Sequence, residues 1–188
     1  MHALTQNDRE TLQRAIAEAE GRTHTHLALV VVPASDRYVM YPLAYGALCA
    51  FAVAGVLALF WPHAPLRPVV LGEAVVFLVF SLVFDWLPLR LVLVPPALAR
   101  ARARSLAHRE FAARILTTHR GGVLLFVSLA ERHVELLADR DLHARLGQPM
   151  WDRIVGELTR DAKSKPLCDC LLSALASCSG ALQAAKSD

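Results

Sequence analysis

The chain has 188 residues, of which 55% are hydrophobic and 20% are charged, and its formal net charge is +3. Globular chains usually contain about 45–50% apolar residues, so the composition excludes an ordinary soluble domain over the whole length. The small net charge gives no reason to expect nucleic acid as a partner.

The first segment is expected to form a helix and a strand. Thr5 and Asp8 approximate a capping box, and apolar residues follow at helical spacing, at Leu12, Ala15, Ile16 and Ala19. A helix over 6–20 is therefore predicted, with Gly21 placed to end it in the left-handed conformation. The Val-rich run 25–32 is too short to span a membrane and too continuous for a half-exposed edge, so it predicts a buried strand.

Two apolar runs come next, at 38–61 and 68–94. The first contains no charged residue and is longer than the ~20 residues that a helix needs to cross a bilayer. The second carries Glu73, Asp85 and Arg90 near its ends, and a single buried helix is the alternative interpretation for it. Their short connection predicts a membrane-spanning helical hairpin over 38–95. No secretory signal precedes it, so the first run is expected to be a retained anchor.

Charged residues around the hairpin predict its orientation. Arginines are concentrated after the second run, at Arg90, Arg100, Arg102, Arg104, Arg109 and Arg114, whereas the connection holds only Arg67. By the positive-inside rule both termini face the cytoplasm, with anionic lipid head groups as the nearest partner of the arginines. A solvated helix face and a nucleic-acid patch are the alternatives. Glu73 and Asp85 lie close to the predicted interfaces and are interpreted as anchors, with a functional role as the alternative.

After the hairpin, the pattern predicts a long helix over 97–118, a β-hairpin with arms at 123–129 and 133–138, and a helix over 149–163. A last helix carries the apolar stripe Leu167, Leu171, Leu175, Cys178 and Leu182. The strand at 25–32 has no partner before the membrane insert, so it is expected to join this later sheet. The predicted fold is α/β, a small helix-flanked sheet whose domain is split into 1–37 and 96–188 by the hairpin at 38–95.

The run Gly121-Gly122-Val123 through Ala138-Asp139-Arg140 resembles the central hairpin of TPM domains, which occur in thylakoid-lumen photosystem-repair proteins and in many bacterial membrane proteins. The resemblance covers about residues 4–32 and 97–183. It implies a TPM-like α/β sandwich and, because some members are phosphatases or bind calcium, a carboxylate site beyond the hairpin. This chain has Ala138-Asp139-Arg140-Asp141-Leu142 where many relatives have a Gly-Tyr-Gly type turn, so for the form with an internal membrane hairpin the resemblance implies fold and membrane placement only.

Four acidic residues are candidate ligands for Ca²⁺ or Mg²⁺, because hard cations bind several oxygen ligands: Asp139, Asp141, Glu135 and Asp152. The alternative is a solvated turn in which they cap helices or pair with Arg140, Arg145 and Arg153. The histidines do not converge by sequence, although His119 and His133 flank the first arm of the β-hairpin. Cys168, Cys170 and Cys178 are interpreted as buried thiols, with a metal or redox site as the alternative.

No P-loop, dinucleotide fingerprint or serine nucleophile elbow occurs in the sequence. Two functions remain as hypotheses. The preferred one is an accessory or protein-interaction module in the bacterial inner membrane, with two spans, cytoplasmic termini, a membrane or cytoplasmic protein partner, and homo-oligomers as a further expectation. The alternative is a divalent-metal-dependent phosphatase that uses the acids after the β-hairpin.

Overall fold

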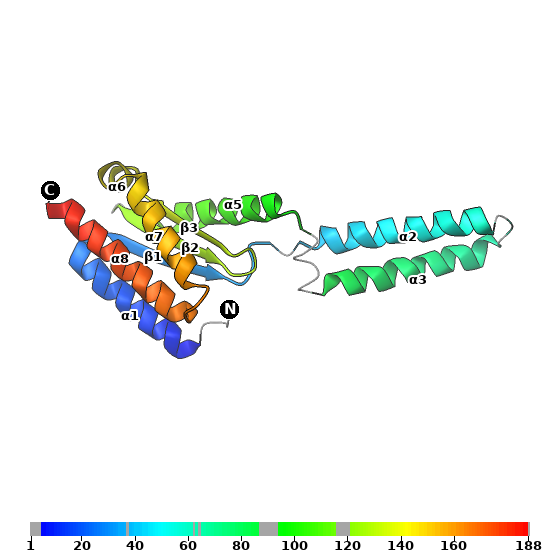
Figure 1. Ribbon diagram of the computed structural model, residues 1–188, viewed down its shortest axis with the longest axis horizontal. Coiled ribbons are helices and arrows are strands. Elements are labelled where there is room, and N and C mark those ends of the chain that lie inside the picture. Colours follow the sequence, from blue (N-terminus) through cyan, green and yellow to red (C-terminus); the bar gives the residue numbers. More distant parts are fainter. Residues whose placement is uncertain are drawn as a thin grey trace. The chain divides into compact units, whose positions relative to one another are not determined.

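The computed structural model describes residues 5–36, 38–61, 63, 65–86, 94–115 and 121–187. The chain divides into two compact units, one formed by Met1–Ser35 with Ala101–Asp188 and the other by Asp36–Arg100. Figure 1 labels their helices and strands. Arg90 and His119, which the sequence analysis singled out, lie outside the described residues.

The first unit is built on a three-stranded sheet with the order β1-β2-β3. Strand β1 (His26–Val32) pairs in parallel with β2 (Gly122–Ser128), and β2 pairs antiparallel with β3 (His133–Ala138). The register aligns His26 with Gly122 and Val32 with Ser128. The segments before and after the two apolar runs therefore contribute to one sheet, as predicted.

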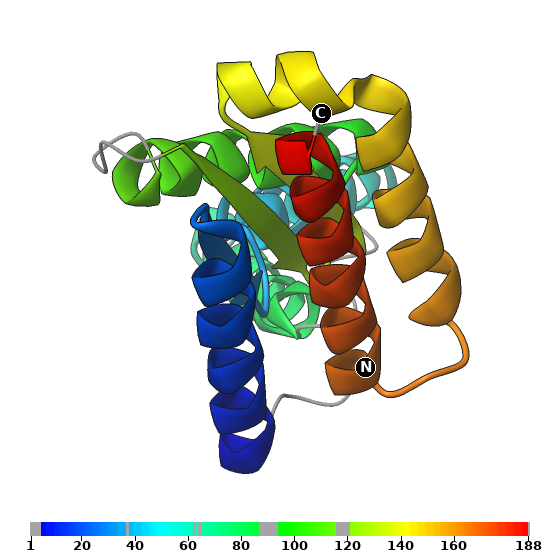
Figure 2. The same ribbon diagram turned by 90° about the vertical axis from the view of Figure 1, so that its left-hand side faces the viewer.

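Helices cover both faces of this sheet (Figures 1 and 2). On one face α1 (Gln6–Thr23), α7 (Gln148–Asp161) and α8 (Leu167–Ser187) pack over alternate strand residues such as Leu27 and Leu125. On the other face α5 (Pro96–Arg114) packs over the intervening residues, including Val30 and Phe126. Strand β2 is buried at every position, because it is central and covered on both faces. The predicted α/β class is confirmed.

Strand β1 differs from its prediction. The continuous apolar run was expected to lie inside the sheet, but β1 is an edge strand, with β2 as its neighbour on one side within the described residues. Composition predicts how apolar a strand's surroundings are, whereas strand order depends on which strands pair. Strand β2 is the central strand of this sheet, since it pairs with β1 on one side and with β3 on the other.

Helix α1 also ends later than predicted. It continues past Gly21 to Thr23, and His24 adopts the left-handed conformation with φ of 54°. Two interactions stabilise the longer end: the Thr23 hydroxyl donates to the Ala19 carbonyl at 2.8 Å, and the His24 N–H donates to the Glu20 carbonyl at 2.8 Å. A short helix, α6 (Arg140–Leu146), was not predicted and lies between β3 and α7.

The second unit is an apolar helix pair, α2 (Met40–Phe60) and α3 (Leu66–Asp85), packed as a hairpin. Small residues allow a close approach of the two helices: a Cβ added to Gly46 would lie 2.4 Å from the Ser81 hydroxyl oxygen. Close approach through small residues is typical of helix packing in membranes. Tyr45 and Phe84 add an edge-to-face ring contact, with centroids 6.2 Å apart.

Both helices of the pair are long and apolar enough to cross a membrane, and most of their surface is exposed apolar side chain. Over an apolar stretch of 18 residues in each helix, only 11% is buried inside the protein in α2 and 6% in α3. These exposed apolar faces fit contact with lipid. The α8 helix also meets the length and composition of a span, but 44% of it is buried and it packs in the core of the first unit.

Candidate interaction site

Two of the four predicted metal-binding acids lie at the start of α6, and a third lies within α7. Asp139 is the N-cap of α6, and its carboxylate accepts a hydrogen bond from the Arg140 N–H at 2.6 Å. Asp141 is in the first turn of the same helix. Asp152, in the first half of α7, accepts from the Gln148 side-chain amide at 2.8 Å. The positions of Asp139 and Asp141 suit carboxylates because the first turn of a helix has unpaired N–H groups.

The fourth acid, Glu135, lies on β3 and has its own partners. Its side chain is 16% exposed and lies 3.1 Å from His133 Nε2, 3.6 Å from Arg104 Nε and 3.8 Å from His108 Nε2. These contacts join the edge of the sheet to α5. The structure therefore pairs Glu135 with basic side chains rather than with the three other acids.

Among the described residues, no group of three His, Cys, Asp or Glu side chains is arranged to hold a metal ion. Metal binding by the four acids stays a prediction. Of the three cysteines of α8 that were interpreted as buried thiols, Cys170 and Cys178 are buried and Cys168 is half-buried. Burial in apolar surroundings raises the pKa of the Cys178 thiol to about 12, which leaves it in the unreactive protonated form.

A carboxylate network that sequence reasoning missed lies at the carboxyl ends of β1 and β2. Glu131 accepts hydrogen bonds from the buried Ser128 hydroxyl and from the Ser35 N–H, the latter at 2.9 Å. The Ser35 hydroxyl also donates to the Ser128 hydroxyl oxygen at 2.9 Å. Ser128 at the end of an otherwise apolar strand was the available signal. The network fastens the segment before the membrane insert to the β-hairpin after it.

Strand β1 presents an open edge. Its residues alternate: the His26 N–H donates to the Gly121 carbonyl at 3.1 Å, and the Val32 carbonyl accepts from the Leu129 N–H at 3.0 Å, so even-numbered positions pair with β2. The N–H and C=O groups of the odd-numbered residues point away from β2. Within the described residues, no hydrogen bond reaches the outward N–H groups of Leu29 and Val31.

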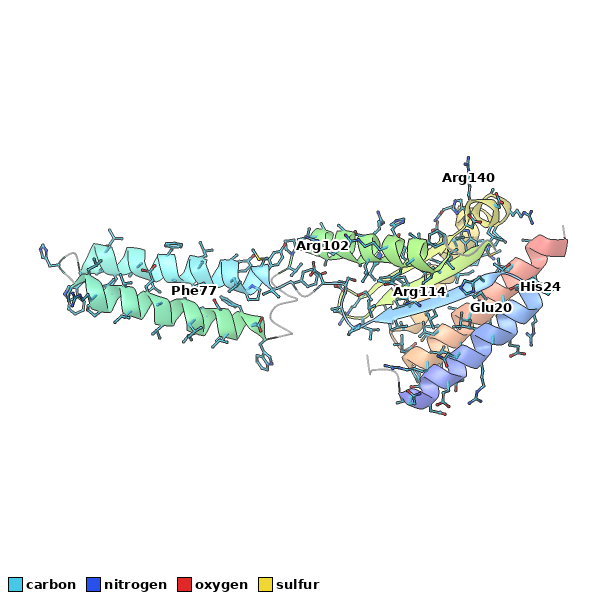
Figure 3. All side chains as sticks on the ribbon, turned by 180° about the vertical axis from the view of Figure 1, so that it is seen from behind. Glu20, His24, Phe77, Arg102, Arg114 and Arg140 are labelled. Carbon is cyan, nitrogen blue, oxygen red and sulfur yellow. The ribbon has the colours of Figure 1, made fainter. Side chains whose placement is uncertain are left out.

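The two ends of this edge are closed. At the start, the Glu20 carboxylate accepts a hydrogen bond from the Leu27 N–H at 2.8 Å and lies 2.5 Å from His26 Nδ1; Figure 3 shows Glu20 on α1 beside the beginning of β1. At the other end Pro33 has no N–H group. Leu29 and Val31 therefore form the accessible part of the edge.

An apolar groove runs beside this accessible part, between α1 and β1. Its volume is about 390 Å³, and it is lined by Arg9, Leu12, Gln13, Ile16, Leu29, Val31, Pro33 and Leu129. We call it the edge groove. The Leu29 and Val31 side chains are half-buried in it. An extended chain that pairs with β1 could place alternate side chains in the edge groove, since side chains of a strand alternate between faces.

A second hollow, of about 450 Å³, lies between α2 and α3. Its walls are almost entirely apolar, and Glu73 and Trp61 are among its lining residues. Glu73 is half-buried there, which fits an anchor position. Apolar walls of this kind are compatible with contact to lipid.

No family model and no curated protein matches this chain.

Proposed function

We propose that this protein is a membrane-anchored protein-interaction module. The α2–α3 hairpin anchors the chain in the bilayer, and the TPM-like α/β domain binds an extended protein segment at the open edge of β1. The observation that carries the proposal is the pair of outward N–H and C=O groups at Leu29 and Val31 beside the edge groove. Addition of a strand to an open sheet edge is a common way to recognise a peptide.

The orientation follows from the charges on α5. Arg100, Arg102, Arg104, Arg109 and Arg114 all lie on or at the end of this helix, close in sequence to the second span. The positive-inside rule then places the α/β domain and both termini on the cytoplasmic side, in a bacterial inner membrane.

The arrangement of the acids favours an interaction module over a phosphatase. Asp139 caps a helix, Asp152 is hydrogen-bonded to Gln148, and Glu135 has Arg104 beside it. Hydrolysis of a phosphate ester with a divalent metal needs acids that converge on one open point. Each of these three acids instead has a separate structural role or partner.

The test uses the full-length protein in native membranes. A photoreactive phenylalanine analogue is introduced at Gln13, which is exposed on α1 and lines the edge groove, and in a matched variant at Glu18, which is exposed on the same helix but does not line the groove. We expect a covalent adduct with protein on illumination of the Gln13 variant and none with the Glu18 variant.

The adduct should depend on the backbone of β1. Val31→Pro removes an outward N–H group without removing a bond to β2, because proline is tolerated at edge positions whose N–H faces solvent. Val31→Ala keeps that N–H. The Gln13 adduct should disappear with Val31→Pro and persist with Val31→Ala. Equal adducts at Gln13 and Glu18, or loss with both substitutions, would contradict the proposal.

A further inference from the structure

Between its two closed ends, strand β1 lacks the residues that usually prevent an exposed edge strand from pairing with another chain. Natural edge strands carry charged residues, internal prolines or bulges that prevent pairing with another chain. The sequence from Leu27 to Val32 is Leu-Ala-Leu-Val-Val-Val, without a charge or a proline, and its pairing with β2 is regular throughout. An edge of this composition is expected to be covered.

We infer that the segment covering it is β1 of a second copy of this chain. This inference rests on the proposed function, because it names the partner that binds the edge. The two strands run antiparallel about a two-fold axis at Val30, and the two sheets join into one six-stranded sheet with the order β3-β2-β1-β1-β2-β3.

The free backbone groups fix this register. Around an axis at Val30, Leu29 of one copy lies opposite Val31 of the other, and the reverse pair is equivalent by symmetry. Both residues have an outward N–H and an outward C=O, so each pair exchanges two hydrogen bonds. The outward N–H and C=O groups of Leu29 and Val31 are then satisfied in both strands.

The closed ends of the edge match in the same register. Leu27 of one copy lies opposite Pro33 of the other. The Leu27 N–H is already bound by Glu20, the Pro33 carbonyl already accepts from the Ala130 N–H at 2.9 Å, and Pro33 has no N–H to donate. Pairing therefore ends at Leu27 and Pro33, because the Leu27 N–H is already bound by Glu20 and Pro33 offers no N–H to the Leu27 carbonyl.

The neighbouring registers fit less well. An axis at Leu29 would place the Val31 carbonyl of one copy against the Leu27 N–H that Glu20 already binds, and it would bring that carbonyl towards the Glu20 carboxylate. An axis at Val31 would place Leu29 opposite Pro33, which offers no N–H group. Moving the axis by one residue, which shifts the register of the two strands by two residues, is thus disfavoured in both directions.

Charges on α1 are complementary in this arrangement. Glu20 lies beside Leu27, at the start of the edge, and Arg9 lines the edge groove together with Pro33, at its end. The two-fold axis brings the Leu27 end of one copy to the Pro33 end of the other. Arg9 of each copy therefore comes to the Glu20 end of its partner. A partner strand in this position also covers the edge groove, since its Val31 side chain lies next to Leu29 on the same face.

Membrane anchoring favours the association. Two copies held in one bilayer by their hairpins meet at a much higher effective concentration than free domains, so a short strand pairing is sufficient.

Cysteine cross-linking of the full-length protein in membranes tests the register. Directly opposite residues that do not exchange hydrogen bonds in an antiparallel pair have Cα atoms about 4.5 Å apart, within the range of about 4.4–6.8 Å that a disulfide needs. Val30→Cys should therefore form a disulfide with itself under mild oxidation and give a band at twice the chain mass, above the background of the parent with its four native cysteines.

Ala28→Cys and Val32→Cys are the matched controls, because they lie on the same face of β1 as Val30. Each should fail to cross-link alone, since the two copies of either residue are about 14 Å apart along the paired strands. Co-expressed with different tags, they should cross-link to each other, because Ala28 lies opposite Val32. This second pair also tests the inference independently of the fold of the Val30 variant.

Absence of both the Val30 dimer and the mixed Ala28–Val32 dimer would overturn the inference, and so would a dimer of Ala28→Cys alone as strong as that of Val30→Cys. The photoreactive Gln13 variant separates this failure from failure of the proposed function. An adduct whose mass differs from that of two chains would keep the edge as a binding site for another protein. If no adduct of any mass forms, both the dimer and the proposed function are contradicted.

Discussion

The α/β domain should depend on the segment that precedes the membrane insert. We compare the fragment 97–188 with a fusion in which a flexible linker joins 1–35 to 97–188. Leu12, Leu27 and Val30 are buried to 3%, 4% and 7% exposure, and all three belong to the first segment. Burial of each such side chain contributes about 1.5–3 kcal/mol.

The fragment therefore loses about 5–9 kcal/mol of burial, which is comparable with the total stability of about 5–15 kcal/mol of a typical domain. It also exposes one whole edge of β2, a strand that is buried at every position in the intact domain. The fusion should unfold in a single cooperative transition, and the fragment should show no such transition. Urea titration followed by circular dichroism measures both.

A point substitution in the fusion connects this result to β1. Leu27→Ala should lower the free energy of unfolding by about 2–5 kcal/mol, since it removes a buried Leu side chain from the core. A fragment 97–188 that unfolds at the same urea concentration as the fusion would refute the reasoning, because the first segment would then add nothing to the sheet.

Three further predictions concern the membrane topology, the hairpin and the acids. A cysteine introduced at Ala64 should react with an impermeant thiol reagent added to intact cells, and one at Ser187 should not; the reverse labelling would contradict the orientation. Gly46→Leu should destabilise the α2–α3 pair in detergent by about 1–3 kcal/mol through overpacking, because the added Cβ would lie 2.4 Å from the Ser81 hydroxyl oxygen; Gly55→Leu, with no atom near the added Cβ, should be neutral in the same thermal assay. Asp139→Ala should cost about 1 kcal/mol as the loss of a helix cap, equally in chelator and in millimolar calcium; a calcium-induced rise in the melting temperature that the substitution abolishes would instead favour a metal site.

The elements with long or strongly periodic patterns were predictable from the sequence. The membrane runs, the β-hairpin and the amphipathic α7 each carry many residues that agree on one structure, so small local exceptions do not change the outcome. The joining of the first strand to the later sheet was predictable for a different reason. A single strand with no partner cannot satisfy its backbone, so it had to pair across the insert.

The short and local features were not predictable in the same way. Helix α6 is only seven residues long, which is too short for a periodic pattern, and its capping residue Asp139 was among the acids assigned to a metal site. The end of α1 lies beyond Gly21, where the Thr23 hydroxyl and the His24 N–H each donate to a carbonyl of the preceding turn. Gly21 predicted an earlier end from its conformational preference alone, which does not show whether later residues can continue the helix.

The placement of β1 joins the sequence and the fold in one argument. Its residues have the composition of a central strand, yet the sheet of one chain puts it at an edge. Edge strands that face water normally carry charges, because an apolar edge pairs with other chains. In the six-stranded sheet that we infer for two copies, β1 is a central strand with a partner on both sides. The composition that made the single-chain prediction wrong is thus the composition that the paired sheet requires.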